Sequence, residues 1–241
     1  MTQAIDQERP GAPTRLWWRT LDYAAVLRWQ ALGLLGSRGR GPAAQHGQPG
    51  ATAPPVVLVP GVYEPWHFLR PLAASLRRHA IPVHHVPGLG RNVGAVPSGA
   101  AILARYLATT DLHDVVLVAH SKGGLIGKLA MGAHDPGQRI SSMVTLNTPF
   151  AGSGLARWMA GRTLREFAPT NATILALAAD SAANSRIVAV RSRWDPHIPR
   201  AGELTGATNV VLSTPGHFRP LADPRLVELV LAELGRAGPG R

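Results

Sequence analysis

The chain has 241 residues, of which 45% are hydrophobic, so it can bury a full core and fits one domain with an appendage. It contains no cysteine, which excludes disulfides, thiol catalysis and thiolate-bound metals. The formal net charge of +11 comes almost wholly from arginines that are scattered along the chain. Because no basic stripe is interleaved with aromatic residues, we expect no nucleic-acid partner, whereas contact with an anionic membrane stays open.

Residues 1–50 are predicted to form an N-terminal arm. Its polar start is followed by a helix over residues 15–35, which Thr14 is placed to cap, and by a flexible linker from Ser37 to Pro55. One face of the helix is broad and apolar. The polar stripe at helical spacing consists of Arg15, Arg19, Asp22 and Gln30.

The apolar face of this helix has two interpretations, which are packing against the domain and insertion at a membrane interface. In the second, Trp17, Trp18 and Trp29 lie among the lipid headgroups. Arg28 interrupts the face and disfavours a spanning helix, because a charge at the bilayer centre costs about 2.5–3.5 kcal/mol. The first residues lack the basic start of a signal peptide, so we expect a cytoplasmic protein, with peripheral membrane contact under the second interpretation.

After the linker, β-branched runs alternate with helix-like segments. This alternation predicts an α/β domain over residues 51–241, with a mostly parallel sheet covered by helices on both faces. The predicted strands are Val56–Val59, Pro82–Val86, Val115–Ala119, Ser141–Leu146, Ile187–Arg191 and Asn209–Leu212. The predicted helices are Phe68–Arg78, Gly99–Thr109 with Ser98 as its cap, Lys122–Ala133, and Pro224–Leu234 with Asp223 as its cap.

The segment Ala119-His120-Ser121-Lys122-Gly123 lies between a predicted strand and a predicted helix. Small residues two before and two after the serine let strand and helix approach closely while Ser121 takes a strained backbone conformation. Such a turn is typical of a nucleophile elbow, which exposes a serine hydroxyl in a cleft. The usual form is Gly-x-Ser-x-Gly, and Ala119 replaces the first glycine here at the cost of one added methyl group.

Segments 55–61, 87–92, 119–124 and 146–153 lie along the chain in the order typical of one family. They resemble the α/β-hydrolase family and within it the bacterial triacylglycerol lipases and esterases. The resemblance runs from about residue 54 to about residue 236 and does not cover the first fifty residues. It implies an α/β-hydrolase fold, a small lid-like insertion over about 150–184, and the chain order serine, acid, histidine.

This resemblance makes Ser121 the expected nucleophile, which needs a histidine base oriented by a carboxylate. Asp195 is the expected acid, because it follows a predicted strand and its Asp-x-x-Ile spacing resembles the family's Asp-x-x-Val turn. Asp180 is the rival acid, but it ends an alanine-rich helical stretch and lacks a preceding strand.

His217 is the expected base, since Gly216-His217 follows the last predicted strand and precedes the last helix. His197 is a poorer candidate because it sits beside the expected acid, and His120 is expected to pack under the elbow. We expect no metal and no cofactor, and the adjacent His84 and His85 point to opposite faces of a strand.

The oxyanion hole is expected to use two backbone N–H groups. One is that of Lys122, after the nucleophile, and the other that of Val62 in Pro60-Gly61-Val62-Tyr63, with Tyr63 as second choice. This segment matches the family's His-Gly-x motif, except that Pro60 replaces the histidine, which affects loop support but not the donor.

The expected substrate is a lipid or acyl ester, because the insertion carries apolar clusters suited to acyl chains. The substrate-binding residues are expected to be Tyr63, Trp66, Trp158 and Trp194. The predicted function is therefore carboxylic ester hydrolysis, with acyl transfer or thioester hydrolysis, and non-catalytic membrane-associated binding, as alternatives. Deleting residues 1–50 is expected to weaken liposome binding more than hydrolysis of soluble esters; the oligomeric state stays open.

Overall fold

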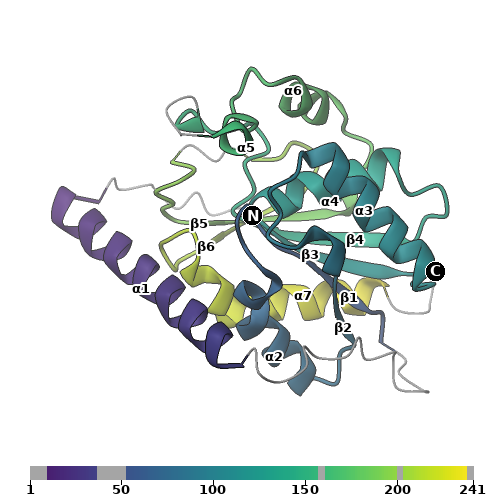
Figure 1. The fold of residues 1–241 in the computed structure, drawn as a ribbon, viewed down its shortest axis with the longest axis horizontal. Coiled ribbons are helices and arrows are strands. Elements are labelled where there is room, and N and C mark those ends of the chain that lie inside the picture. The colour runs from purple at the N-terminus through teal and green to yellow at the C-terminus, as the bar shows by residue number, and fades with distance from the viewer. Residues whose placement is uncertain (1–9, 37–52, 157–160, 200–202, 238–241) are drawn as a thin grey trace.

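The computed structural model describes residues 10–36, 53–156, 161–199 and 203–237 (Figure 1). The polar start of the arm, most of its predicted linker and Trp158 lie outside the described residues. Six strands form one parallel sheet in the order β2-β1-β3-β4-β5-β6, which confirms the predicted fold class. The strands are β1 (Val56–Val59), β2 (Val83–His85), β3 (Val115–His120), β4 (Ile140–Leu146), β5 (Ile187–Ser192) and β6 (Thr208–Leu212).

Helices lie on both faces of the sheet, with α3 and α4 on one side and α2 and α7 on the other (Figure 1). The α-helices are α1 (Ala12–Gly36), α2 (Arg70–Arg78), α3 (Val96–Thr109), α4 (Lys122–Ala133), α5 (Arg162–Arg165), α6 (Ala172–Ala179) and α7 (Pro224–Ala237). Short 3-10 helices are η1 (Trp66–Leu69), η2 (Pro87–Leu89), η4 (Asn184–Arg186) and η5 (Arg219–Ala222).

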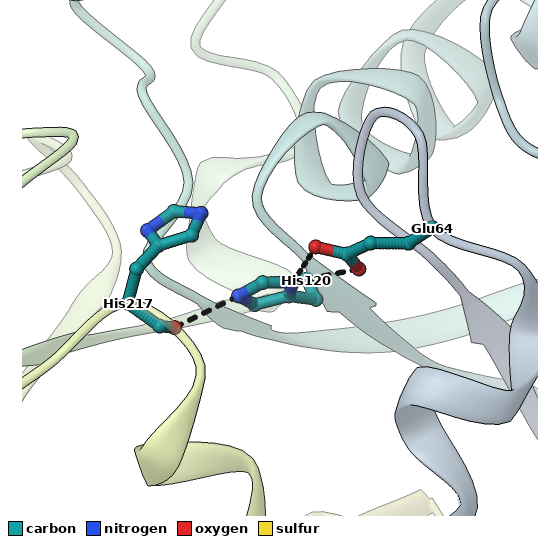
Figure 2. A group of neighbouring side chains, drawn as sticks. All are labelled: Glu64, His120 and His217. Atoms are coloured by element: carbon teal, nitrogen blue, oxygen red, sulfur yellow. Dashed lines mark hydrogen bonds and ion pairs between the residues drawn. The ribbon is translucent and has the colours of Figure 1, made fainter. Parts of the chain in front are cut away.

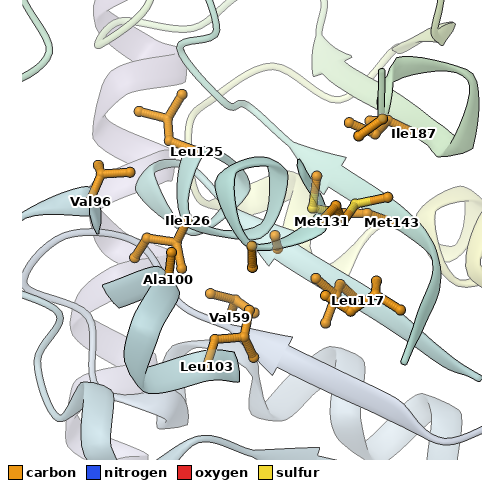
Figure 3. Packing of buried hydrophobic residues seen from close by; sticks show 14 of the residues in the cluster. Val59, Val96, Ala100, Leu103, Leu117, Leu125, Ile126, Met131, Met143 and Ile187 are labelled. Carbon is orange, nitrogen blue, oxygen red and sulfur yellow. The ribbon is translucent and has the colours of Figure 1, made fainter. Parts of the chain in front are cut away.

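The core is split by the sheet into two apolar clusters, because successive side chains of a strand point to opposite faces. Val57 and Val59 of β1 belong to the cluster that includes residues of α3 and α4, which Figure 3 shows from close by. Val56 and Leu58 belong to the cluster that includes residues of α2 and α7. Burial on both faces explains why β1 and most of β3 are continuous apolar runs. Because all six strands are parallel, their carboxyl ends lie at one edge of the sheet.

Two helices begin earlier than the sequence predicted. α1 begins at Ala12, so Thr14 lies inside the helix instead of capping it. α3 begins at Val96, so Ser98 also lies inside the helix. The Val96 N–H donates instead to the carboxylate of Glu166, at 2.9 Å, and this distant side chain replaces the predicted local cap.

α1 packs along the domain beside η1 and η5 (Figure 1). Trp18, Asp22, Val26 and Trp29 repeat at helical spacing and are buried or half-buried, and Asp22 is fully buried although it belongs to the predicted polar stripe. The exposed large hydrophobic side chains of α1, among those that the structure describes, are Leu16, Trp17, Tyr23 and Leu27. Within the described residues, no helix combines the length and the apolar character that crossing a membrane requires.

The insertion over about residues 150–184 contains α5 and α6. Ile174 and Leu177 of α6 are buried in the cluster beside α4, so this part is a covering helix of the domain. Leu164 and Phe167, in and after α5, also pack in or against this cluster, and they line a cavity above the carboxyl ends of the strands. Among the described residues of the insertion, those that line this cavity belong to its first half.

Candidate active site

Ser121 forms the sharp turn between β3 and α4. Its backbone angles are φ 51° and ψ −120°, which confirms the strained conformation expected of an elbow. The approach of α4 leaves no room for larger residues: a Cβ atom on Gly123 would lie 2.2 Å from the carbonyl oxygen of Val59. A Cβ on Gly124 would lie 2.1 Å from the Thr148 hydroxyl oxygen, so both glycines are required by this turn.

Asp195 and His217 form a buried pair in the loops after β5 and β6. The Asp195 Oδ2 atom lies 2.7 Å from His217 Nδ1, and Asp195 Oδ1 accepts the backbone N–H groups of His197, at 2.7 Å, and Ile198, at 3.1 Å. These bonds fix the carboxylate and assign the Nδ1 hydrogen of His217 to Asp195, which leaves Nε2 available to a third group. The rival acid Asp180 instead ends α6 and accepts the N–H of Ala182.

Each member of this pair stabilises the charged form of the other. Burial lowers the pKa of His217, but the charge of Asp195, the hydrogen bond to it, and the charges of Glu64 and Asp22 together raise this pKa above its ordinary value of 6.5. Burial raises the pKa of Asp195, yet the charge and hydrogen bond of His217 hold it below its ordinary value of 3.8. For His197, burial and then the charge of His217 lower the pKa to about 4, so this ring is neutral at pH 7.

Ser121 and His217 open onto the same cavity, which has a volume of about 310 Å³. This volume is at the lower end of the range for small-molecule sites. Val62 and Tyr63 also line the cavity, and so do residues of α1 and of the insertion. The apolar lining residues are Val26, Val62, Phe68, Pro149, Leu164, Phe167, Ile198 and Phe218.

Two of the predicted substrate-binding tryptophans, Trp66 and Trp194, are not among the described residues that line this cavity. Trp66 stacks on the rings of His67 and His85, with centroids 4.4 and 4.9 Å apart. Trp194 packs against Trp18 of α1, 5.7 Å between centroids. Trp66 begins η1 and Trp194 lies in the loop after β5. Because their rings pack against other rings, we do not include them in the substrate pocket.

The loop after β1 is held by one side chain of its own and by one from a distant loop. The Gly61 N–H donates to the carboxylate of Glu64 at 2.7 Å, and the Asn92 side chain donates to the Pro60 carbonyl at 2.7 Å. The buried Lys122 ammonium group donates to the carbonyl oxygens of Asn92 and Gly94. These bonds tie the loop between η2 and α3 to the start of α4. Asn92 therefore supports the loop at Pro60, which stands where the family that the chain resembles has a histidine.

His120 lies between Glu64 and the backbone of His217 (Figure 2). His120 Nε2 is 3.0 Å from the His217 carbonyl oxygen, which can only accept, so Nε2 carries a hydrogen. His120 Nδ1 is 2.9 Å from the Glu64 carboxylate, which also accepts the Gly61 N–H. His120 therefore packs under the elbow, as predicted. Glu64 connects the loop after β1 to the end of β3 and, through His120, to the loop of His217, which the sequence analysis did not foresee.

Asn147, at the end of β4, is a further residue whose role the sequence analysis missed. Its side-chain N–H groups donate to the carbonyls of Gly216, at 3.1 Å, and His217, at 2.9 Å, and its oxygen accepts the Ser192 N–H at 2.8 Å. The only signal for it was its position in the segment 146–153, which resembles the family. Asn147 thus ties the histidine loop to the end of β5.

Two groups of three potential metal ligands lie in this region, and both include His217. One adds Glu64 and His120, and the other adds Asp195 and His197. The bonds His120–Glu64 and His217–Asp195 already account for their proximity. We interpret both groups as parts of one hydrogen-bonded network and assign no metal to them.

No protein-family model matches the chain, and no curated protein matches its sequence. Solved structures match in fold: a mature lipase from Bacillus licheniformis has a TM-score of 0.63 and 16% identity over 80% of this chain and 96% of its own. Lipase B from Aspergillus fumigatus has a TM-score of 0.61 and 16% identity over 83% and 56% of the two chains. An extracellular alpha/beta-hydrolase from a Paenibacillus species has a TM-score of 0.53 and 14% identity over 78% and 100%. The chain therefore has the α/β-hydrolase fold.

The pKa directions give a prediction for the histidine pair. His217 should titrate with a midpoint above 6.5 because the surrounding carboxylates stabilise its protonated ring, and His197 should titrate far lower, near 4. The measurement is an NMR titration of the ring protons, assigned with His217→Gln and His197→Gln. A His217 midpoint below 6.5, or two equal midpoints, would contradict the described electrostatics.

The link through Glu64 gives a prediction for stability. Glu64→Gln should lower the free energy of unfolding by about 1–3 kcal/mol, because a buried carboxylate that accepts bonds from Gly61 and His120 is replaced by a weaker acceptor. Urea unfolding measures the change. The matched control is Glu228→Gln, whose carboxylate pairs with Arg225 at the surface and should matter by no more than about 0.5 kcal/mol. Equal losses for the two variants would refute the role assigned to Glu64.

Proposed function

We propose that the protein is a serine hydrolase that cleaves carboxylic esters. The single observation that carries this proposal is that an elbow serine and the imidazole of a buried Asp–His pair open onto one mostly apolar cavity. A serine hydroxyl is a weak nucleophile and requires such a base. The fold shared with lipases is consistent with this activity.

In the proposed reaction, Ser121 Oγ attacks the ester carbonyl while Nε2 of His217 takes its proton. Asp195 holds the ring and stabilises its protonated form. The protonated His217 then gives its proton to the departing alcohol, which leaves an acyl group on Ser121. Water, deprotonated by His217, attacks this acyl-enzyme, and the carboxylic acid leaves as the serine hydroxyl is restored.

The negative charge that forms on the carbonyl oxygen requires nearby donors. We assign them to the backbone N–H groups of Lys122 and Val62. Support for Lys122 comes from its position at the N-terminus of α4, where the helix dipole favours an anion. Val62 lines the cavity in a loop held by Glu64 and Asn92. The acyl group would lie against the apolar lining of the cavity, with Tyr63 at its edge, and burial would contribute about 0.8 kcal/mol per methylene.

The proposal predicts a large loss of ester hydrolysis in two variants and almost none in a matched control. With p-nitrophenyl butyrate as substrate, Ser121→Ala should lower kcat by at least about 10⁴-fold, and Asp195→Asn by about 10⁴-fold, because the histidine then adopts the wrong tautomer. The matched control Asp180→Asn should stay within about twofold of the wild type.

Other outcomes would contradict the assigned acid, the assigned reaction or the enzymatic role. Equal losses in Asp180→Asn and Asp195→Asn would contradict the assigned acid. Faster reaction with acyl thioesters, or transfer of the acyl group to an added alcohol, would replace hydrolysis of esters by one of the two alternative reactions. A folded wild-type chain without turnover in detergent would favour the non-catalytic membrane-associated binding protein.

We further propose peripheral contact with an anionic membrane through α1. The support is that Leu16, Trp17 and Leu27 of this helix are 60–68% exposed and that the chain carries a net charge of +11. Contact of this kind would bring the cavity, which α1 also lines, close to lipid substrates.

This contact predicts that Trp17→Ala with Leu27→Ala weakens binding to phosphatidylserine-containing vesicles by roughly tenfold, and that added salt weakens wild-type binding. Vesicle co-sedimentation measures both. The control is Leu175→Ala, which removes a 55% exposed side chain on α6. Binding that is unchanged in the double variant, or equally weakened in the control, would exclude α1 as the contact surface.

A further inference from the structure

Asp22 of α1 is a fully buried carboxylate whose partners all belong to one loop. Its Oδ2 atom accepts the backbone N–H of His217 at 2.8 Å. Its Oδ1 atom accepts the N–H groups of Phe218 and Arg219, both at 2.9 Å. Three consecutive N–H groups that begin at the proposed base are thus held by a single side chain, 195 positions earlier in the sequence.

The loop is shaped to receive this carboxylate. Gly216 has φ 119°, a conformation that other residues rarely adopt, and a Cβ atom there would lie 2.3 Å from Asp22 Oδ1. The glycine beside His217 is therefore needed for contact with α1 as well as for the turn itself. The Gly216 N–H donates to the Trp194 carbonyl at 2.8 Å, which connects the same loop to the segment that carries Asp195.

α1 also contacts the acid loop and the cavity. The Tyr23 hydroxyl lies 3.0 Å from Nε2 of His197, whose backbone N–H is bonded to Asp195. Tyr23, Val26 and Gln30 line the cavity onto which Ser121 opens. One helix from outside the region of family resemblance thus touches the acid loop, the histidine loop and the substrate pocket.

We propose that Asp22 is a positioning residue for His217, so that α1 is part of the active site and not a detachable arm. The proposal rests on the proposed ester hydrolase function. Asp22 acts through the backbone of the loop: when its three bonds hold residues 217–219, the imidazole is directed toward both Asp195 and Ser121. The sequence-based expectation that deleting residues 1–50 weakens liposome binding more than hydrolysis of soluble esters is therefore replaced by an expected loss of hydrolysis.

The charge of Asp22 adds a signature that packing alone would not produce. The groups that face His217 are Asp195, Glu64 with His120, His197 beside the ring, and Asp22 from α1. Burial lowers the pKa of His217, and the charges of Asp195, Glu64 and Asp22 raise it. Removing the Asp22 charge should therefore move the acid limb of the rate profile to lower pH, because the base then stays neutral in more acidic solution.

The experiment compares the wild type, Asp22→Asn and Thr20→Ala, an exposed position on the same helix, with p-nitrophenyl butyrate from pH 5 to 9. Active sites are counted with a fluorophosphonate so that kcat refers to folded enzyme. Asp22→Asn should lower kcat at least about tenfold, with KM within about threefold and the acid limb at lower pH. Thr20→Ala should match the wild type. If Asp22→Asn does not fold, Asp22→Glu, which keeps the carboxylate on a longer stem, is used and should show reduced kcat.

Hydrogen exchange of the wild type provides a second readout without turnover. The amides of residues 217–219 should be protected, and their protection should fall in Asp22→Asn but not in Thr20→Ala. An active wild type whose kcat and acid limb are retained in Asp22→Asn, or unprotected amides at 217–219, would overturn the positioning role and leave the proposed function standing. A wild type that neither hydrolyses esters nor reacts with the fluorophosphonate would overturn both.

Discussion

The loop around His217 is buried, and its backbone polar groups need partners that its own sequence does not provide. An unpaired buried N–H or carbonyl costs about 1–3 kcal/mol. Asp22 accepts three of the N–H groups, while Asn147 and His120 donate to the carbonyls. The position of the imidazole is therefore set by three side chains from separate parts of the chain. The geometry with Asp195, and with it the proposed chemistry, depends on this set of long-range bonds.

The elbow shows the complementary case, in which local sequence and tertiary packing agree. The backbone of Ser121 is strained, and strain of this kind persists only when the surroundings hold it. The close approach of α4 to the end of β1 provides the constraint, because Gly123 has no space for a side chain. Lys122, the next residue, is buried and fastens the loop beside it. A single segment thus supplies the serine, its conformation and part of its support.

The sequence predicted the parts of this protein that depend on local patterns. The apolar runs and the small residues around Ser121 identified the strands and the elbow, and chain order selected Asp195 and His217, which do form a pair. It failed where a side chain acts across the fold. Nothing in the neighbourhood of Asp22 or Glu64 distinguishes a buried loop anchor from a solvated carboxylate. Two aromatic residues assigned to substrate binding from their loop positions pack on other rings instead, because a loop position does not fix where a ring points.

Activation of Ser121 by His217 is the step on which the proposed chemistry depends, and site-resolved labelling with a fluorophosphonate measures it. We expect one adduct per chain, located on Ser121 by peptide mapping, that forms at least about 10³-fold more slowly in His217→Gln. His113→Gln, which removes an exposed histidine, should label like the wild type. An adduct on another serine, or labelling of Ser121 at an unchanged rate in His217→Gln, would show that His217 does not activate Ser121.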